Sequence, residues 1–341
     1  MKYILAHDLG TSGNKATLFS DEGKMITSEV FRYDCHYFNT NWAEQDPEDF
    51  WKAICVTSRN LIDKARIDPG DIAAVSFSGQ MMGCLCVDKQ GNPLRPSIIW
   101  ADQRAQAQAA ALGEQISLRD FYHIAGHRNS ASYGLQKLMW VRDNEPEVFK
   151  KAAGFYSNQQ YVMRKLGLGD VQDRTMAARK LMIDVKANCW SAPILELAGV
   201  TEQQLGTQIV ESATVVGTID HYGSVRLPRT LPVTIGCHDV SASLLSAGVR
   251  LENPDTIGVL MGTYEQMGYF SDTFVDGCND FGDSLIFSCC YSSPFNNKYT
   301  VMDAFPTAGA LLEWFCKNIL RDPSADIGKL IADAKLDGTG S

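Results

Sequence analysis

The stretch Asp8-Leu9-Gly10-Thr11-Ser12-Gly13 decides how the rest of the chain is interpreted. Apolar, strand-forming residues precede it at 3–6 and follow it at 16–19, and a polar turn at 20–24 leads into a third expected strand at 25–33. Strands joined by short turns in this way form an antiparallel meander. The sequence therefore predicts a sheet with an antiparallel edge.

The residue types in the first turn suit a bound phosphate group. Gly10 and Gly13 allow the backbone to approach a ligand closely. Thr11 and Ser12 add hydroxyl and N–H donors, and Lys15 supplies a cation shortly after them. The alternative is a plain glycine hairpin, and the spacing alone leaves both open.

Two carboxylates follow expected strands. Asp8, at the end of the first strand, could hold Mg²⁺, usually through water, because Mg²⁺ keeps much of its hydration shell. Its alternative role is to cap the turn. Asp239 follows a short buried strand at 231–236, where a carboxylate could accept a proton from an attacking hydroxyl. Capping of a helix expected at 241–247 is the simpler role for Asp239.

The clearest helix signal lies at Asp46-Pro47-Glu48-Asp49, which supplies a capping Asp, Pro at the first helical position and acids in the first turn. Apolar residues then recur with helical spacing as far as Ala65, so one face of this helix is expected to be buried. Further elements are expected as strands at 71–78 and 84–87 and as helices at 132–144 and 159–166.

A weaker signal divides the chain in two. An apolar strand at 256–263 ends in Gly262-Thr263 and repeats the opening design of strand, Gly-Thr turn and strand. A duplicated fold would place two phosphate-facing turns on opposite walls of a cleft. Because the pattern also breaks around residue 250, we predict a first domain over 1–250 and a second over 251–341.

Length and composition narrow the class of protein. The 341 residues suggest two domains, and 40 Asp and Glu against 31 Lys and Arg give a formal net charge of −9. This acidic balance disfavours a nucleic-acid or anionic-membrane partner, since either would need a basic surface. No apolar stretch could span a bilayer and the N-terminus carries no signal peptide, so a cytoplasmic location is expected. The ten cysteines are spread along the chain and are expected to be reduced.

The common nucleotide motifs are absent. No G-x-x-x-x-G-K-[ST] sequence occurs, which excludes a P-loop. Gly167-Leu168-Gly169 lacks the third glycine of a dinucleotide fingerprint, and Val141-Arg142-Asp143-Asn144 lacks the other elements of a protein kinase. The opening turn remains the best candidate for a phosphate site.

Six stretches of the chain stand in the order of one enzyme family's motifs. They are residues 8–12, 41–51, 78–83, 98–105, 178–184 and 236–239. Together they resemble the FGGY carbohydrate kinases, especially the xylulokinase-like branch, and Gly262-Thr263 fits the family's second phosphate turn. The resemblance covers nearly all of the chain, and six ordered stretches are far more specific than one Asp-x-Gly-Thr.

The resemblance implies an α/β fold of the actin-like ATPase (RNase H-like) class, with two domains around a nucleotide cleft. It implies ATP-dependent phosphorylation of a hydroxyl of a sugar or sugar-like polyol, with ATP and Mg²⁺ as cofactors. The partner would be that small molecule, with neither nucleic acid nor membrane involved. Catalysis would depend mostly on positioning and charge stabilisation, with domain closure excluding water.

The resemblance also implies roles for individual residues, carried over by position. ATP phosphates would be held by Gly10, Thr11, Ser12, Lys15, Gly262 and Thr263. The catalytic pair would be Asp8, which organises Mg²⁺ through water, and Asp239, the base that deprotonates the substrate hydroxyl. The sugar pocket would be lined by Gln80, Met81, Met82, Trp100 and Asp102, with Asp239.

Three departures from the family pattern bear on the substrate. Met82 stands where xylulokinases usually carry His, and Val240 where Asn or Gln is often found. His238 replaces a common Gly, as in the deoxy-sugar kinases for rhamnulose and fuculose. A pocket that lacks polar partners would reject a ketopentose, so we expect a different sugar, sugar alcohol or sugar acid, with a deoxy-sugar kinase as an alternative.

Two other classes compete with the kinase. One is a catalytically silent sugar- or nucleotide-binding relative on the same fold, and the other is a structural actin relative. The kinase is favoured because Asp8, Asp239 and both Gly-Thr turns are intact. The oligomeric state stays open, with a homodimer as one option.

The length of the chain is short for this family. The second domain ends at Ser341, where a kinase of this family would continue through its adenosine-binding segment. We therefore expect a C-terminally truncated chain that has little activity by itself, and we assign the kinase function to the complete protein.

Overall fold

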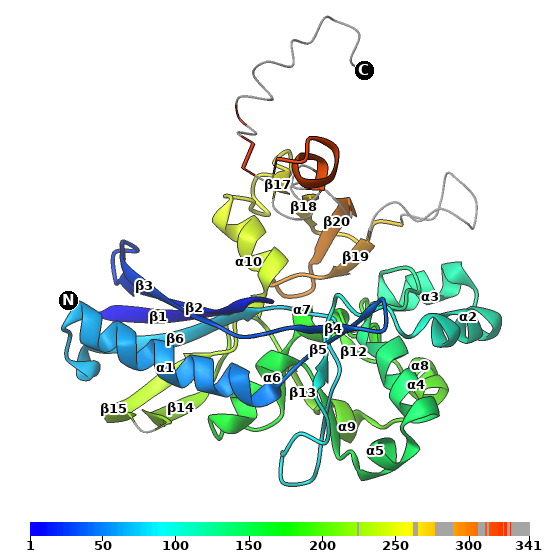
Figure 1. The fold of residues 1–341 in the computed structure, drawn as a ribbon, viewed down its shortest axis with the longest axis horizontal. Coiled ribbons are helices and arrows are strands. Elements are labelled where there is room, and N and C mark those ends of the chain that lie inside the picture. The colour runs from blue at the N-terminus through cyan, green and yellow to red at the C-terminus, as the bar shows by residue number, and fades with distance from the viewer. Residues whose placement is uncertain are drawn as a thin grey trace, which may run out of the picture.

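The computed structural model describes residues 1–223, 225–261, 265–276, 289–305, 311, 314–322, 324–325 and 328. A large mixed sheet and a smaller antiparallel sheet form its framework (Figure 1). The helix α10 (Asp239–Ser246) contacts β6 of the large sheet and β17 of the small one, so it joins the two parts.

The large sheet has the strand order β14-β15-β6-β1-β2-β3, with β16 also paired to β6. Its strands are β1 (Tyr3–Leu9), β2 (Gly13–Ser20), β3 (Met25–Arg32), β6 (Ile72–Gly79), β14 (Val215–Tyr222), β15 (Val225–Thr234) and β16 (Cys237–His238). The strands β1, β2 and β3 pair antiparallel, which confirms the predicted meander. The strand β6 lies parallel to β1, β15 and β16.

The helix α1 (Pro47–Ala65) packs on β2 and β3 and confirms the predicted helix start. The side chain of Asp46 accepts a hydrogen bond from the N–H of Glu48 at 2.9 Å, which caps the first turn. Phe50, Ile54 and Leu61 are completely buried at helical spacing, so the apolar face predicted from the sequence is the one that packs on the sheet.

Figure 1 shows α2 (Gln106–Gln115), α3 (Leu118–Ala125), α4 (Gly134–Asn144), α5 (Pro146–Lys151), α8 (Ala192–Ala198) and α9 (Glu202–Leu205) together on the right, beyond the large sheet. The helix α6 (Asn158–Lys165) contacts β6 of the large sheet, and α7 (Arg174–Ala178) contacts β16. A 3₁₀ turn η1 (Pro69–Asp71) contacts β15, and a π-helical turn η2 (Phe315–Ile319) lies beside the small sheet (Figure 1). The helices predicted at 132–144 and 159–166 are confirmed as α4 and α6.

Short strand pairs connect these helices. They are β4 (His36–Phe38), β5 (Trp42–Gln45) and β8 (Ser97–Ile98) in one sheet, β7 (Leu85–Val87) with β9 (Gly154–Tyr156), β10 (Val171–Asp173) with β13 (Gln208–Val210), and β11 (Ile183–Asp184) with β12 (Cys189–Trp190). The strands predicted at 71–78 and 84–87 are confirmed as β6 and β7.

The small sheet has the order β17-β18-β20-β19, and all its pairs are antiparallel. Its strands are β17 (Gly258–Met261), β18 (Glu265–Ser271), β19 (Cys289–Ser292) and β20 (Tyr299–Phe305). The strands of the predicted second strand–turn–strand unit are therefore present as β17 and β18. The predicted phosphate turn between them, Gly262-Thr263, lies outside the described residues. The division into domains at 250/251 stays a prediction.

Two further observations concern the cysteines and the apolar character of the helices. The nine cysteines in the described part of the chain are all free. Among the described helices, none combines the length and the apolar character needed to cross a membrane.

Candidate active site

The carboxyl ends of three neighbouring strands meet at one point of the large sheet. Asp8 in β1 lies opposite Ser78 in the parallel strand β6, and Asp239 directly follows β16, which pairs with the end of β6. A cavity of about 350 Å³ opens here, and Asp8, Lys15, Ser78 and Asp239 are among its lining residues. Folding thus brings two predicted catalytic acids and a predicted phosphate-binding cation together.

Gly236 makes this convergence possible. The chain turns sharply between β15 and β16, and Gly236 has a φ of +74°, a conformation that residues with a side chain rarely adopt. A Cβ atom at this position would lie 1.6 Å from the carbonyl oxygen of Phe77 in β6. Only glycine therefore allows the chain to approach β6 closely enough to place Asp239 at the end of the strand.

The carbonyl groups of the turn after β1 accept hydrogen bonds from residues outside the turn. The hydroxyl of Tyr33 donates to the oxygen of Gly10 at 2.6 Å, and Nε2 of Gln45 donates to the oxygen of Thr11 at 2.6 Å. The oxygen of Ser12 accepts from the N–H of Tyr33 at 3.4 Å. Within the described residues, the N–H groups of Thr11 and Ser12 have no acceptor. A turn with occupied carbonyls and unoccupied N–H groups fits an anion.

Asp239 stands at the first position of α10, with 41% of its side chain exposed. Its Oδ1 accepts the N–H of Val240 at 2.8 Å. Desolvation by the surrounding chain, followed by the negative charge of Asp8, raises the pKa of Asp239 to about 7, against an opposing effect of Arg179. The carboxylate is thus poised to exchange a proton near neutral pH.

The helix cap that the sequence analysis considered for Asp239 is provided by His238 instead. Nδ1 of His238 accepts the N–H of Ser241 at 3.2 Å, and the imidazole is completely buried. Burial lowers the pKa of His238 well below its ordinary value, so the ring is neutral. The predicted helix therefore begins at Asp239 rather than 241, and the carboxylate is left free of the capping role.

The loop Gln80–Met82 follows β6 in the chain and is linked by hydrogen bonds to the turn after β1. Nε2 of Gln80 donates to Oε1 of Gln45 at 2.8 Å, and Gln45 in turn holds Thr11. Met81 is buried, whereas Met82 is half-buried and has a φ of +66°. The predicted substrate loop is thus coupled to the predicted phosphate turn by two side-chain amides.

Trp100 and Asp102, both predicted to line the sugar pocket, lie in different surroundings. Nε1 of Trp100 donates to Oγ1 of Thr11 at 2.7 Å, so this side chain reaches the phosphate turn. Asp102 is completely buried, and its Oδ2 accepts the N–H of Ala43 at 2.7 Å and a guanidinium N–H of Arg104 at 2.7 Å. The structure places Asp102 as an internal support, and its direct contact with a substrate stays a prediction.

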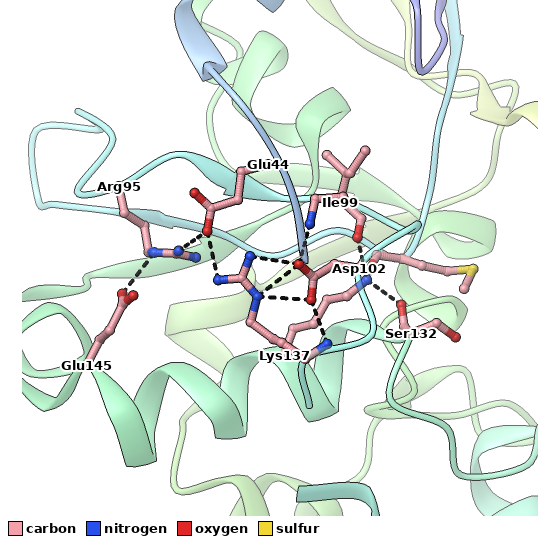
Figure 2. Close-up of polar contacts among 10 residues, drawn as sticks. Glu44, Arg95, Ile99, Asp102, Ser132, Lys137 and Glu145 are labelled. Atoms are coloured by element: carbon pink, nitrogen blue, oxygen red, sulfur yellow. Dashed lines mark hydrogen bonds and ion pairs between the residues drawn. The ribbon is translucent and has the colours of Figure 1, made fainter. Parts of the chain in front are cut away.

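A buried ion network surrounds Asp102 (Figure 2). Arg104 pairs with both Asp102 and Glu44, each at 2.7 Å. Arg95 also pairs with Glu44 and lies 2.9 Å from Glu145. Every buried charge in this network therefore has an opposite charge beside it, which is the condition under which buried ion pairs are tolerated.

The ammonium group of Lys137 donates hydrogen bonds to three segments of the chain near this network (Figure 2). Its Nζ donates to the carbonyl oxygens of Ile99 at 2.7 Å and Met82 at 3.0 Å, and also to that of Ser132. Burial lowers the pKa of Lys137 to about 7. Sequence reasoning missed this residue, and the only available signal was a lysine at a buried position of an apolar helix.

The donor set at the cavity fits a magnesium ion held through water. Oδ1 of Asp8 accepts the hydroxyl of Ser78 at 2.9 Å, and Asp8 and Asp239 both line the cavity. In the described part of the chain no cluster of three or more His, Cys, Asp or Glu forms a protein cage for a metal. Mg²⁺ commonly binds through one or two carboxylates and keeps several waters, so two carboxylates suffice.

Comparisons with known proteins point to one family. The N-terminal domain of the FGGY family of carbohydrate kinases matches residues 3–246. The xylulose kinase of Bacillus subtilis is 27% identical over 322 residues, which are 92% of this chain and 62% of that protein. A glycerol kinase from a Nostoc species is 27% identical over 346 residues, 99% of this chain and 67% of that protein.

A solved structure supports the same fold. The gluconate kinase from Lactobacillus acidophilus superposes with a TM-score of 0.86 at 23% identity, covering 97% of this chain and 65% of its own. The chain thus spans about two thirds of the length of the proteins that it matches. The fold is that of the actin-like ATPases, and the chain belongs to the FGGY family of carbohydrate kinases.

Proposed function

We propose that the complete protein transfers the γ-phosphoryl group of ATP to a hydroxyl of a small sugar-like substrate. The observation that carries this proposal is the meeting of Asp8, Lys15 and Asp239 in one cavity beside a turn suited to phosphate. Phosphoryl transfer needs a proton acceptor, a phosphate cradle and a cation, and these residues can supply all three.

Asp239 is the proposed base. It takes the proton of the substrate hydroxyl as that oxygen forms its bond to the γ-phosphorus, while the bond from phosphorus to the bridging oxygen breaks and ADP leaves. A carboxylate whose pKa desolvation and the charge of Asp8 raise to about 7 is ionised in part of the molecules at neutral pH, and it is basic enough to accept this proton.

The turn after β1 is the proposed phosphate cradle. The unoccupied N–H groups of Thr11 and Ser12, the adjacent Gly10 and the ammonium group of Lys15 would hold the phosphates. Mg²⁺, held through water by Asp8, would neutralise phosphate charge. Gly262 and Thr263 are proposed to complete this cradle from the second domain.

The loop Gln80–Met82 and Trp100 are proposed to form the substrate pocket, with Asp102 and Lys137 supporting it from behind. Similar proteins are named for xylulose, glycerol and gluconate, so the family tolerates varied substrates. Because Met82 contributes no hydrogen-bonding group comparable to histidine, we propose a substrate other than xylulose. A deoxy-sugar remains the alternative.

An ADP-release assay on the complete encoded protein, with a panel of sugars, sugar alcohols and sugar acids, tests the function. Asp239→Asn keeps the shape of the side chain and removes the base, so we expect kcat to fall by about 1000-fold. Asp63→Asn, an exposed acid on α1, is the matched control and should keep full activity. Substrate binding without turnover in the wild-type protein would instead support a silent binding protein.

A further inference from the structure

Arg179 carries a buried charge that the proposed mechanism does not use. The residue follows α7 and is 3% exposed. Its Nη2 donates to the hydroxyl oxygen of Tyr133 at 2.8 Å and lies 3.9 Å from Sδ of Met82. Its Nη1 lies 3.7 Å from Sγ of Cys289. Nε has no hydrogen-bond partner. None of the ion pairs among the described residues includes Arg179.

This arrangement is costly for a free guanidinium group. A buried cation without an opposite charge loses its hydration and gains little in return. The faces of the group pack against the rings of Tyr133 and Tyr291, with centroids at 5.0 Å and 4.5 Å, which offsets part of the cost. Burial raises the pKa of Tyr133 to about 12, so this phenol stays neutral and supplies no charge.

A chain of hydrogen bonds fixes the direction in which Arg179 donates. Nδ1 of His127 donates to the oxygen of Arg128 at 2.9 Å, so Nε2 accepts the hydroxyl hydrogen of Tyr133 at 2.7 Å. This assignment follows from the bonding pattern. The hydroxyl oxygen of Tyr133 therefore accepts from Nη2 of Arg179. Nη1 has only the sulfur atom of Cys289 as a partner, and Nε has none.

Arg179 lies beside the proposed substrate loop. It contacts Met82 in the proposed substrate loop, and its charge is felt by the base Asp239. It is absent from the residues that line the cavity of Asp8 and Lys15. An anion at Arg179 would therefore belong to the substrate rather than to the phosphates. Met82 covers Nη2 with a flexible thioether, which can move aside for a ligand.

We infer that Arg179 binds a carboxylate of the substrate, so that the substrate is a sugar acid. The carboxylate would pair with the Nε and Nη1 donors, and a hydroxyl elsewhere on the same molecule would reach Asp239. The inference rests on the proposed kinase function and narrows its substrate to polyhydroxylated acids. Arg179 thereby becomes the residue that separates an acid from the corresponding neutral polyol.

Matched substrate pairs test the inference in the complete protein. D-gluconate is compared with D-glucitol and D-xylonate with xylitol, since each pair differs by a carboxylate against a hydroxymethyl group. The ADP-release assay is run well above the pKa of Asp239, so that the base is ionised throughout. We expect kcat/KM to be roughly 100-fold higher for an acid than for its neutral counterpart. Turnover of the neutral members alone would overturn the inference.

Variants separate recognition of the carboxylate from other roles of the charge. Arg179→Gln should lower kcat/KM for the acid roughly 30-fold more than for the neutral polyol. Arg179→Lys keeps the charge but loses the planar fork, so an intermediate loss is expected. Arg164→Gln, which removes a surface cation paired with Asp170, is the matched control. Equal losses on both members of a pair would mean a structural or phosphoryl-stabilising role and would overturn the inference.

Calorimetry without ATP distinguishes this inference from the kinase proposal. If the protein has no turnover but binds gluconate or xylonate, and Arg179→Gln abolishes this binding, the kinase function is wrong and the role of Arg179 is supported. If the protein phosphorylates neutral polyols but binds neither acid, the kinase function is supported and the role of Arg179 is wrong. If Arg179→Gln fails to fold, as judged by circular dichroism, the wild-type pairs and Arg179→Lys still decide.

Discussion

Two clusters around buried arginines differ in their counter-charges. In the first, Arg104 and Arg95 are matched by Asp102, Glu44 and Glu145. In the second, Arg179 has the rings of Tyr133 and Tyr291, the hydroxyl group of Tyr133 and two sulfur atoms around it. We therefore assign the paired charges to the support of the fold and the unpaired charge of Arg179 to the binding of a ligand.

The largest loss of stability is expected when an acid is removed from the cluster of paired charges. Asp102→Ala would leave Arg104 only Glu44 as a partner and free the N–H of Ala43, so we expect a loss of about 3–5 kcal/mol in the free energy of unfolding. Urea denaturation measures this loss. Asp170→Ala, which removes a surface partner of Arg164, is the control, with an expected loss of less than about 1 kcal/mol. Similar losses in the two variants would contradict the assignment of Asp102 as a structural support.

Removing the cation itself sharpens the contrast between the clusters. Arg179→Met removes an unpaired buried charge, so the free energy of unfolding should fall by no more than about 1.5 kcal/mol, since only one hydrogen bond and two ring contacts are lost. Arg104→Met would leave the buried carboxylate of Asp102 without its cation, while Glu44 keeps Arg95, and should cost about 3–5 kcal/mol. The same denaturation series compares them. A larger loss in Arg179→Met than in Arg104→Met would reverse the interpretation of both clusters.

The unpaired charge of Arg179 should also affect the pH dependence of activity. Burial and Asp8 raise the pKa of Asp239 to about 7, so kcat/KM should rise with pH through that range and level off above it. The positive charge of Arg179 favours the ionised carboxylate, so Arg179→Gln should move this rise to higher pH. A pH–rate profile of a neutral substrate measures the shift. A rise that stays in place would mean that Arg179 has no influence on the base.

The smallest expected effect concerns the residue that orients Arg179. Tyr133→Phe removes the hydroxyl oxygen that accepts from Nη2 at 2.8 Å but keeps the stacked ring. We expect KM for an acidic substrate to rise by roughly 3- to 10-fold, with kcat little changed. Initial-rate kinetics separate the two constants. A fall in kcat without a change in KM would place Tyr133 in the chemical step instead.

Local signals in the sequence predicted the frame of the molecule well. The glycine-containing turn, the alternation of the first three strands and the Asp-Pro start of α1 depend on neighbouring residues, and all are confirmed. The start of α10 was placed two residues late, because the cap is His238, a residue type outside the usual N-cap set.

The candidate site was predicted only in part, and the reason is distance along the chain. Asp8 and Asp239 each followed an expected strand, but their meeting depends on the pairing of β1, β6 and β16. The environment of Arg179 depends on Cys289, which is 110 residues away, so no local pattern could reveal that its charge lacks a partner. Pairing between distant segments decides which buried charges are compensated.

The placement of α10 has a mechanical consequence. This helix contacts β6 of the large sheet and β17 of the small sheet, and it carries Asp239 at its first position. Asp8, by contrast, belongs to the large sheet alone. A rotation of the small sheet relative to the large one would move α10, because α10 contacts β17, and would change the distance between the carboxylates of Asp8 and Asp239. In the proposed reaction, the angle between the two sheets would then set the space in which the phosphoryl group is transferred.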